Sequence, residues 1–195
     1  MLKFVALTGG IGSGKSTALA ALQRLGAAVL STDDVVHELY ASDEVRDAVV
    51  ARFGTEVASG GVVDRAALAE RAFATPEDRG WLEGLLWPRV GARMASWRAS
   101  LEAREDPPRA AVVEVPLLFE AGMEGTFDAT IAVVSDEAVR GQRAGDRGHR
   151  ALDERAARQL TQTEKAERAT YVVQNDGGVD ELEAKLSAVL DMLPG

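Results

Sequence analysis

The sequence predicts an α/β fold in which a five-stranded parallel sheet is flanked by helices. Short apolar runs of strand length alternate with longer stretches of helical character, and the five runs are 4–7, 28–30, 110–115, 129–134 and 171–173. The first run, a glycine-rich turn, an Ala- and Leu-rich segment over 16–25 and the second run follow one another within roughly 30 residues, the length of a βαβ unit. Such units join parallel strands, so the five runs indicate one doubly wound sheet.

The composition of the 195 residues is that of a globular protein with one main core. Apolar residues make up 46% and charged residues 27%, and no apolar run approaches the roughly 18 residues of a membrane-spanning helix. The first residues lead into an apolar run without the features of a secretory signal, so we expect a cytoplasmic protein. With no cysteine and only two histidines, a disulfide scaffold, thiolate chemistry and a multi-histidine zinc site are excluded.

The formal net charge of −9 argues against a general binder of nucleic acid or anionic membrane, because neutralising phosphates requires a basic face. Basic residues are nevertheless concentrated in one segment, since residues 139–168 contain eight basic and five acidic side chains. Two interpretations of this segment stay open. It binds a small polyanionic ligand, or it is a solvated helical face with paired charges.

Two segments do not fit the alternation of strand and helix. Residues 35–104 contain no convincing strand, and a connection of that length indicates an inserted helical subdomain. Residues 139–168 are mostly helical, with glycines near their beginning that permit either a mobile helical hairpin or a plain loop. We therefore expect the core to consist of 1–34, 105–138 and 169–195.

The glycine-rich turn follows the first predicted strand and precedes the first predicted helix. Its sequence satisfies the phosphate-binding pattern G-x-x-x-x-G-K-[ST] with Gly9-Gly10-Ile11-Gly12-Ser13-Gly14-Lys15-Ser16. Glycines allow successive backbone N–H groups to turn toward phosphate oxygens, and the helix N-terminus adds partial positive charge. In this pattern Lys15 reaches the β- and γ-phosphates and the Ser16 hydroxyl ligates Mg²⁺, while Thr17 lies near the α-phosphate. The segment from Gly10 to Thr17 is therefore predicted to bind a nucleoside triphosphate with Mg²⁺.

A phosphate-binding loop does not by itself say what is done with the nucleotide. A switch GTPase is excluded because the strings N-K-x-D and D-x-x-G do not occur. A small kinase needs a carboxylate close to the loop and basic residues over the phosphates. Asp33 and Asp34 follow the second predicted strand, where a carboxylate could accept a hydroxyl proton or hold a magnesium-bound water. The alternative is that Ser31-Thr32-Asp33-Asp34 only caps the next helix.

Several segments resemble one family of small-molecule kinases, the dephospho-coenzyme A kinases, and the resemblance covers nearly the whole chain. The matching parts are the opening T-G-G-I-G-S-G-K-S of Thr8–Ser16, Asp33, Asp64-Arg65, the V-P-L-L-F-E of Val115–Glu120, the pair Arg143 and Arg147, Gln159 with Lys165, and the closing Tyr171–Gly177. Two positions depart from the family pattern, since His37 replaces an arginine and Trp87 a histidine.

The resemblance implies an adenylate-kinase-like P-loop core with a coenzyme-binding insertion over 35–104 and a lid over 139–168. The implied reaction moves the γ-phosphoryl group of ATP to the ribose 3′-hydroxyl of dephospho-CoA, giving CoA and ADP in the last step of coenzyme A synthesis. Mg²⁺ is the implied cofactor. The implied catalytic residues are Lys15, Asp33 as general base, and Arg143 and Arg147 as positive charge over the transferring group.

The resemblance also implies the binding residues and the partners. Contacts to ATP are implied for Asn175 and Gly177 beside the phosphate-binding loop, and contacts to the acceptor for Asp33, His37, Arg65, Pro116, Leu117 and Leu118. The expected partners are ATP and dephospho-CoA, without nucleic acid or membrane, for a monomer or small homo-oligomer. Another kinase of the same fold and an ATP-binding regulator that transfers nothing stay open as alternatives.

Overall fold

The computed structural model describes residues 1–137 and 159–193, which form two compact units. The first unit comprises Met1–Ser31 and Arg98–Gly195, and the second comprises Thr32–Trp97. The sequence analysis placed the corresponding boundaries at 34/35 and 104/105. Most of the predicted lid lies outside the described residues, and its last part belongs to a helix of the first unit.

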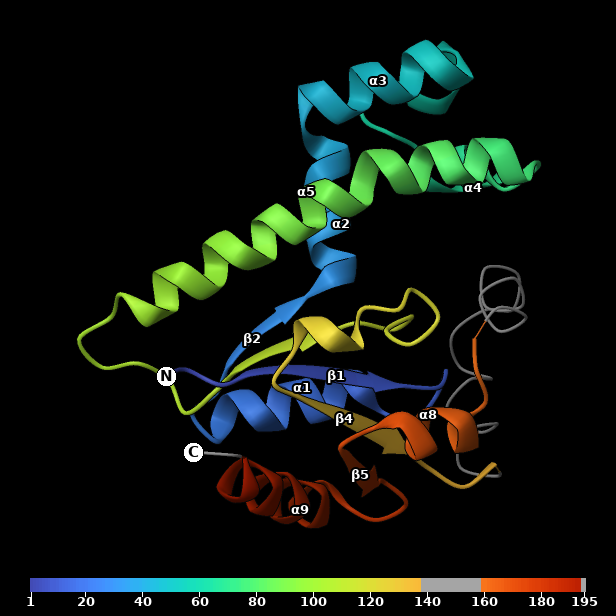
Figure 1. Ribbon diagram of the computed structural model, residues 1–195. Helices are drawn as coiled ribbons and strands as arrows, with labels where there is room; N and C mark the ends of the chain where they lie inside the picture. Colours follow the sequence, from blue (N-terminus) through green and yellow to red (C-terminus); the bar gives the residue numbers. More distant parts are fainter. Residues whose placement is uncertain (138–158, 194–195) are drawn as a thin grey trace. The chain divides into compact units, whose positions relative to one another are not determined.

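Five parallel strands form one sheet in the first unit, which confirms the predicted fold class (Figure 1). Their order is β2-β3-β1-β4-β5, and every pair of neighbours is parallel. Each strand agrees with its predicted run to within two residues at either end; the strands are β1 (Phe4–Gly9), β2 (Ala28–Ser31), β3 (Ala111–Glu114), β4 (Ala129–Val134) and β5 (Tyr171–Gln174).

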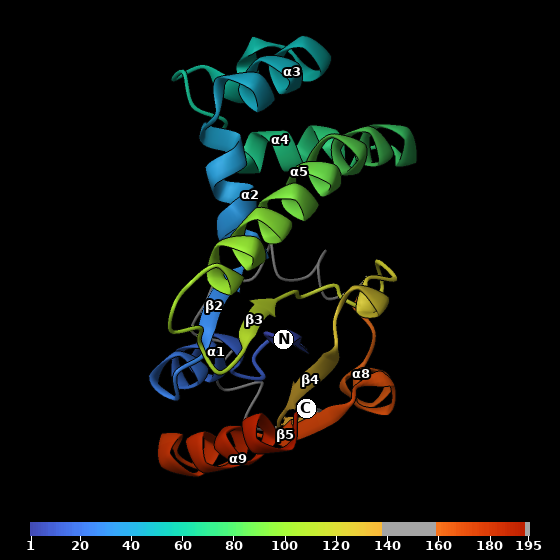
Figure 2. The ribbon, with the colours of Figure 1, turned by 60° about the vertical axis from the view of Figure 1, so that its left-hand side comes forward.

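Two helices, α1 (Lys15–Arg24) and α9 (Val179–Met192), lie side by side against the sheet (Figures 1 and 2). Their apolar residues meet alternate positions of the strands, because successive side chains of a strand point to opposite faces. The resulting core contains Ala18, Ala21, Leu22, Leu182, Leu186 and Val189 of the helices and Val5, Leu7, Val112, Ile131, Val133 and Val173 of the strands.

The alternate positions of β1 face other parts of the first unit. Phe4 stacks on Phe127, with 4.7 Å between ring centroids, and the Arg98 guanidinium lies 5.0 Å from the Phe4 centroid. Arg98 belongs to the end of α5 (Pro76–Glu102), so this contact places the last turns of α5 in the first unit. Helix α8 (Gln162–Arg168) contacts β1 and β4, and the short 3-10 turn η2 (Glu124–Thr126) precedes β4.

The second unit consists of helices and has an apolar core of its own. It contains α2 (Thr32–Ala41), α3 (Asp43–Phe53), η1 (Thr55–Ala58), α4 (Arg65–Ala72) and the larger part of α5. Trp81 packs edge-on against Phe53, with ring centroids 5.5 Å apart. The core contains Tyr40, Val45, Val49, Phe53, Val57, Val63, Leu68, Ala72, Leu82 and Leu86.

Side chains close to the helix ends explain where the helices of the second unit begin. The Ser42 side chain accepts a hydrogen bond from the Val45 N–H at the start of α3. Asp64 does the same for Ala66 and Ala67 at the start of α4, at 2.9 and 3.1 Å. These caps satisfy backbone donors that have no partner inside the helix.

Candidate active site

The carboxyl ends of the parallel strands meet at one edge of the sheet. In the first unit β1 ends at Gly9, β3 at Glu114, β4 at Val134 and β5 at Gln174. Ligands of open α/β sheets bind outside this edge. Because β1 has neighbours on both sides, the turn that follows Gly9 lies in the middle of the edge.

The backbone of this turn requires glycine at three positions. Gly12 and Gly14, the N-cap of α1, have φ values of +76° and +91°, a conformation that other residues rarely adopt. At Gly9 the limit is space, since a Cβ atom would lie 2.4 Å from the Val133 carbonyl oxygen and 2.6 Å from Ser13 Oγ. The turn is therefore packed tightly on β4 and leads directly into α1, the setting that a phosphate-binding loop needs.

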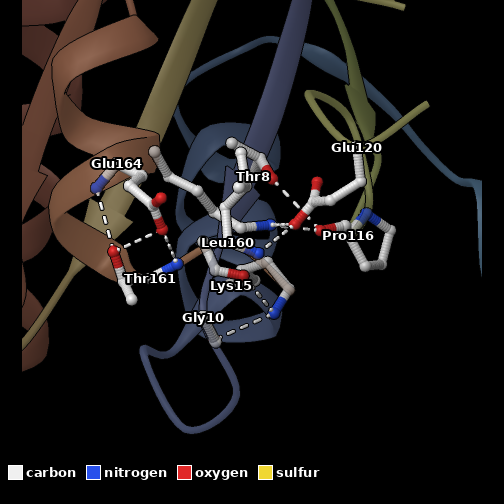
Figure 3. A network of polar contacts seen from close by, with 10 residues as sticks. Thr8, Gly10, Lys15, Pro116, Glu120, Leu160, Thr161 and Glu164 are labelled. Carbon is white, nitrogen blue, oxygen red and sulfur yellow. Dashed lines mark hydrogen bonds and ion pairs between the residues drawn. The ribbon is translucent and has the colours of Figure 1, made fainter. Parts of the chain in front are cut away.

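Lys15 lies against its own loop (Figure 3). Its Nζ atom donates hydrogen bonds to the carbonyl oxygens of Gly9 and Gly10, each at 3.1 Å. Ser16 and Thr17 follow in the first turn of α1 and are exposed, whereas Ser13 is fully buried. The ammonium group and two exposed hydroxyl residues thus gather at the start of one helix.

Asn175 binds the loop from the end of β5. This residue is 5% exposed, and its Nδ2 atom donates a hydrogen bond to the Ser13 carbonyl oxygen at 2.8 Å. Its backbone N–H donates to the Val134 carbonyl oxygen at 2.8 Å. The sequence analysis placed Asn175 and Gly177 at the nucleotide; the structure shows Asn175 holding the loop backbone and Gly177 exposed just beyond it.

The turns after β4 and β5 are fixed by further polar contacts. The Gln162 side chain accepts from the Ser135 N–H at 3.0 Å and donates to the Ser135 carbonyl oxygen at 2.8 Å. The Asp136 N–H donates to the Asp176 carboxylate at 2.6 Å. The chain around the loop is therefore held by side chains from α8 and from the end of β5.

A buried lysine lies behind the turn that follows β3. The side chain of Lys165, in α8, is fully buried, and its Nζ atom donates to the Pro116 carbonyl oxygen at 2.6 Å. The same Nζ atom forms an ion pair with Glu120 Oε1 at 3.0 Å. Figure 3 shows Thr8 and Leu160 in the same network, where Thr8 Oγ1 donates to the Pro116 carbonyl at 3.4 Å and the Leu160 N–H to Glu120 Oε1 at 2.8 Å.

Burial lowers the pKa of Lys165, because a charged amine loses its hydration there, while the hydrogen bond and the charge of Glu120 oppose that shift. The sequence analysis gave no role to Lys165 or to Glu120. Lys165 lies in the segment Q-T-E-K-A-E-R, and no periodicity of this short polar helix marks one lysine as buried. The signals were the family-like pairing of Gln159 with Lys165 and the V-P-L-L-F-E match that ends at Glu120.

The predicted acceptor residues of the first unit lie directly after β3. Pro116 and Leu117 are half-buried, and Leu118 is fully buried in the core. Pro116 therefore offers its carbonyl group to the buried network, while part of Pro116 and of Leu117 stays accessible at the carboxyl edge of the sheet.

The remaining predicted residues that the structure describes lie in the second unit. α2 begins at Thr32, so Asp33 and Asp34 occupy its first turn, where negative charge is favourable, and neither is the N-cap residue. Both are exposed, and so is His37, which lies four residues after Asp33 and hence on the same helix face. Arg65 is exposed at the start of α4. Arg143 and Arg147 lie outside the described residues.

Comparison with known proteins identifies the family. The family profile described as Dephospho-CoA kinase matches residues 3–181. The chain belongs to the dephospho-CoA kinase family. The Dephospho-CoA kinase of Deinococcus radiodurans is 38% identical over 190 residues, covering 96% of this chain and 90% of the relative. That of Protochlamydia amoebophila is 36% identical over 189 residues, with 95% and 93% covered.

Solved structures share this fold. The Thermus thermophilus protein TT1252 superposes with a TM-score of 0.78 at 36% identity, covering 100% of this chain and 99% of that chain. A dephospho-CoA kinase from Campylobacter jejuni gives 0.63 at 20% identity, with 98% and 97% covered. A shikimate kinase from Aquifex aeolicus gives 0.54 at 13% identity over 96% of each chain, which shows a shared P-loop kinase fold.

The residues at the loop fit the Mg²⁺ that the family implies. Mg²⁺ in such kinases is bound through one or two protein oxygens together with substrate phosphates and water. Ser16, exposed beside Lys15 at the start of α1, offers such a hydroxyl oxygen. Within residues 1–137 and 159–193, no group of three or more acidic, histidine or cysteine side chains could hold a metal ion by itself. No helix in these two ranges has the length and apolar character to span a membrane.

Proposed function

We propose that this kinase transfers the γ-phosphoryl group of ATP to the ribose 3′-hydroxyl of dephospho-CoA at the carboxyl edge of its sheet. The observation that supports this most is the loop between β1 and α1, which carries the full phosphate-binding sequence in a chain of the dephospho-CoA kinase family. The product is CoA, so the reaction is the last step of coenzyme A synthesis.

The loop and the start of α1 would hold the phosphates of ATP. Backbone N–H groups of the segment from Gly10 to Thr17 would face the anion, apart from that of Ser13, which donates to the Gly10 carbonyl, and the helix N-terminus would add partial positive charge. Lys15 would exchange its two bonds to the Gly9 and Gly10 carbonyls for phosphate oxygens, which places its charge where negative charge develops. When bound with ATP, Mg²⁺ neutralises charge on the phosphate oxygens, and Ser16 would hold it.

Asp33 would accept the proton of the 3′-hydroxyl as that oxygen bonds to the γ-phosphorus and the bond to the β–γ bridging oxygen breaks. ADP leaves with the electron pair of that bond. His37, Arg65 and the segment Pro116–Leu118 would position the acceptor. Arg143 and Arg147 would supply positive charge over the transferring group.

The cellular location, the roles of the two inserted segments and the oligomeric state are also proposals. We propose an acceptor-binding insertion over 35–104, a lid over 139–168, a cytoplasmic location, and a monomer or small homo-oligomer that binds neither nucleic acid nor membrane.

Incubation of the purified protein with MgATP and dephospho-CoA tests the reaction, with AMP, CMP and adenosine as competing acceptors in parallel. We expect ADP release and a mass gain of one phosphate on dephospho-CoA, with little transfer to the other three. Transfer to another acceptor would keep the kinase chemistry and reject the substrate. ATP binding without transfer to any acceptor would favour the alternative function, an ATP-binding regulator without kinase activity.

Asp33→Asn tests the base, with the neighbouring Asp34→Asn as the matched control. We expect Asp33→Asn to lower kcat by about 100-fold or more while MgATP affinity changes little, because only the proton acceptor is lost. Asp34→Asn, also exposed in the first turn of α2, should keep most of the activity. An equal loss of kcat in the two variants would contradict the assignment of Asp33 as the general base.

A further inference from the structure

We propose that Lys165 is a positioning residue, which orients the Pro116–Leu117 peptide for binding of the phosphoryl acceptor. The inference rests on the proposed function, because it takes the segment after β3 as part of the acceptor site. It goes further in assigning a role to a buried side chain that touches neither substrate.

Lys165 belongs to a network that connects three segments distant in the sequence: β1, the turn from Pro116 to Glu120, and the start of α8. Its Nζ atom reaches from α8 to the Pro116 carbonyl oxygen at 2.6 Å and to Glu120 Oε1 at 3.0 Å. Thr8, at the end of β1, donates to the same carbonyl, and the Leu160 N–H donates to the same carboxylate oxygen (Figure 3). The turn from Pro116 to Glu120 is thus held at both ends.

The bond to Pro116 determines the direction of one peptide group. A peptide unit is planar and trans, so its C=O and N–H point in opposite directions. Fixing the Pro116 carbonyl toward the buried lysine therefore turns the Leu117 N–H away from the network. The ring of Pro116 fixes only the φ of Pro116 itself, so this peptide could still rotate about ψ of Pro116, and the hydrogen bond from Lys165 restrains that rotation.

Stability alone does not account for this arrangement. A buried ion pair contributes little net stability, because each charge loses its hydration, and apolar residues of similar size often serve as well. Among the residues that the structure describes, Glu120 Oε2 is also buried without a hydrogen-bond partner, which adds to the cost. A geometric role is consistent with both observations, because the pair directs one backbone carbonyl that an apolar side chain could not bind.

Three variants test the proposal: Lys165→Met, the double variant Lys165→Met with Glu120→Gln, and Lys185→Met as the matched control. Lys185 also donates to one backbone carbonyl, that of Gln174 at 2.9 Å, and pairs with one glutamate, Glu181, but its side chain is 38% exposed. Each protein is assayed for KM of dephospho-CoA, KM of MgATP and kcat, and its thermal midpoint is measured.

We expect Lys165→Met to lower kcat/KM for dephospho-CoA by about 10- to 100-fold, mainly through KM, while KM for MgATP stays within about twofold. The double variant removes the unpaired carboxylate and should regain thermal stability, yet keep the raised KM because the Pro116 carbonyl still lacks the hydrogen bond from Lys165. Lys185→Met should behave as wild type.

A double variant that regains both stability and wild-type KM would overturn the proposal, since the lysine would then be only structural. Equal changes in both KM values, or none in either, would overturn it as well. Failure of the wild-type protein to phosphorylate dephospho-CoA would instead reject the proposed function.

Discussion

At Gly9 a single methyl group decides whether the phosphate-binding loop can pack on β4. An added Cβ would lie 2.4 Å from the Val133 carbonyl oxygen, a backbone atom that cannot move without disturbing the sheet. We expect Gly9→Ala to lower the free energy of unfolding by about 1–3 kcal/mol and to weaken MgATP binding. Chemical denaturation and calorimetric titration measure the two effects.

Gly91→Ala is the control for Gly9→Ala. Gly91 lies inside α5, where an added Cβ meets nothing within 4 Å, so alanine should stabilise the helix by about 0.5–1 kcal/mol. If Gly9→Ala kept wild-type stability and nucleotide affinity, the close packing of loop and strand would not hold in solution.

Asn175 should also influence nucleotide binding, because its side chain holds the backbone of the loop after β1. Asn175→Asp keeps the shape of the side chain but replaces the amide donor by an oxygen that faces the Ser13 carbonyl. Because a buried carbonyl that loses its donor costs about 1–3 kcal/mol, we expect KM for MgATP to rise about tenfold. Steady-state kinetics with each substrate varied would show a much smaller change for dephospho-CoA. An equal rise in both constants would contradict a role confined to the loop.

Helix α8 is short, and its first turn depends on a reciprocal pair of caps. The Glu164 N–H donates to the Thr161 hydroxyl, and the Thr161 N–H and hydroxyl donate to the Glu164 carboxylate at 2.8 and 2.7 Å. The Thr161 hydroxyl and backbone N–H hold the pKa of Glu164 below its ordinary value. Stability from this contact is therefore present above the ordinary pKa of a glutamate and is lost as the pH falls through the lowered value.

We expect Thr161→Ala to lower the free energy of unfolding at neutral pH by about 1 kcal/mol, and to lower it less at acidic pH, where Glu164 is protonated in both proteins. Denaturant melts of both proteins from neutral to acidic pH measure the difference. Thr163→Ala, exposed in the same helix, is the control. A difference that stays constant over the whole range would show that the carboxylate does not take part.

The elements of the sheet could be predicted from sequence because each depends on local signals. Five apolar runs marked the strands, and the glycine pattern with Lys15 marked the loop. The contacts of Asn175 and Lys165 could not be predicted, since each joins segments far apart in the chain. Asn175 binds Ser13, and Lys165 binds Pro116, through pairings that follow only from the order of the strands. The local sequence around a polar residue does not indicate which distant residue it will contact.

The whole molecule should gain stability from its nucleotide, because a ligand that binds only the folded state shifts the unfolding equilibrium. At a MgATP concentration of about 100 times Kd the expected gain is about 2.7 kcal/mol. Lys15→Ala should reduce this gain strongly at the same concentration, because it removes the ammonium that we propose binds the phosphates. Thermal melts with and without MgATP measure it, with Lys185→Ala as the control lysine. An unchanged gain in Lys15→Ala would place the nucleotide elsewhere.

The chain leaves the sheet after β2 and returns to it in β3, and these two strands are neighbours whose residues pair from Ala28↔Ala111 to Ser31↔Glu114. The sheet therefore closes in the same way whatever lies between them, and doubling the length of such an excursion adds only about 0.6 kcal/mol of closure entropy. Natural variation or protein engineering can consequently exchange residues 42–97, which follow α2, for another helical module while Asp33 and the loop after β1 are kept. On the proposed function, such an exchange would change the acceptor while the loop after β1 stays the same.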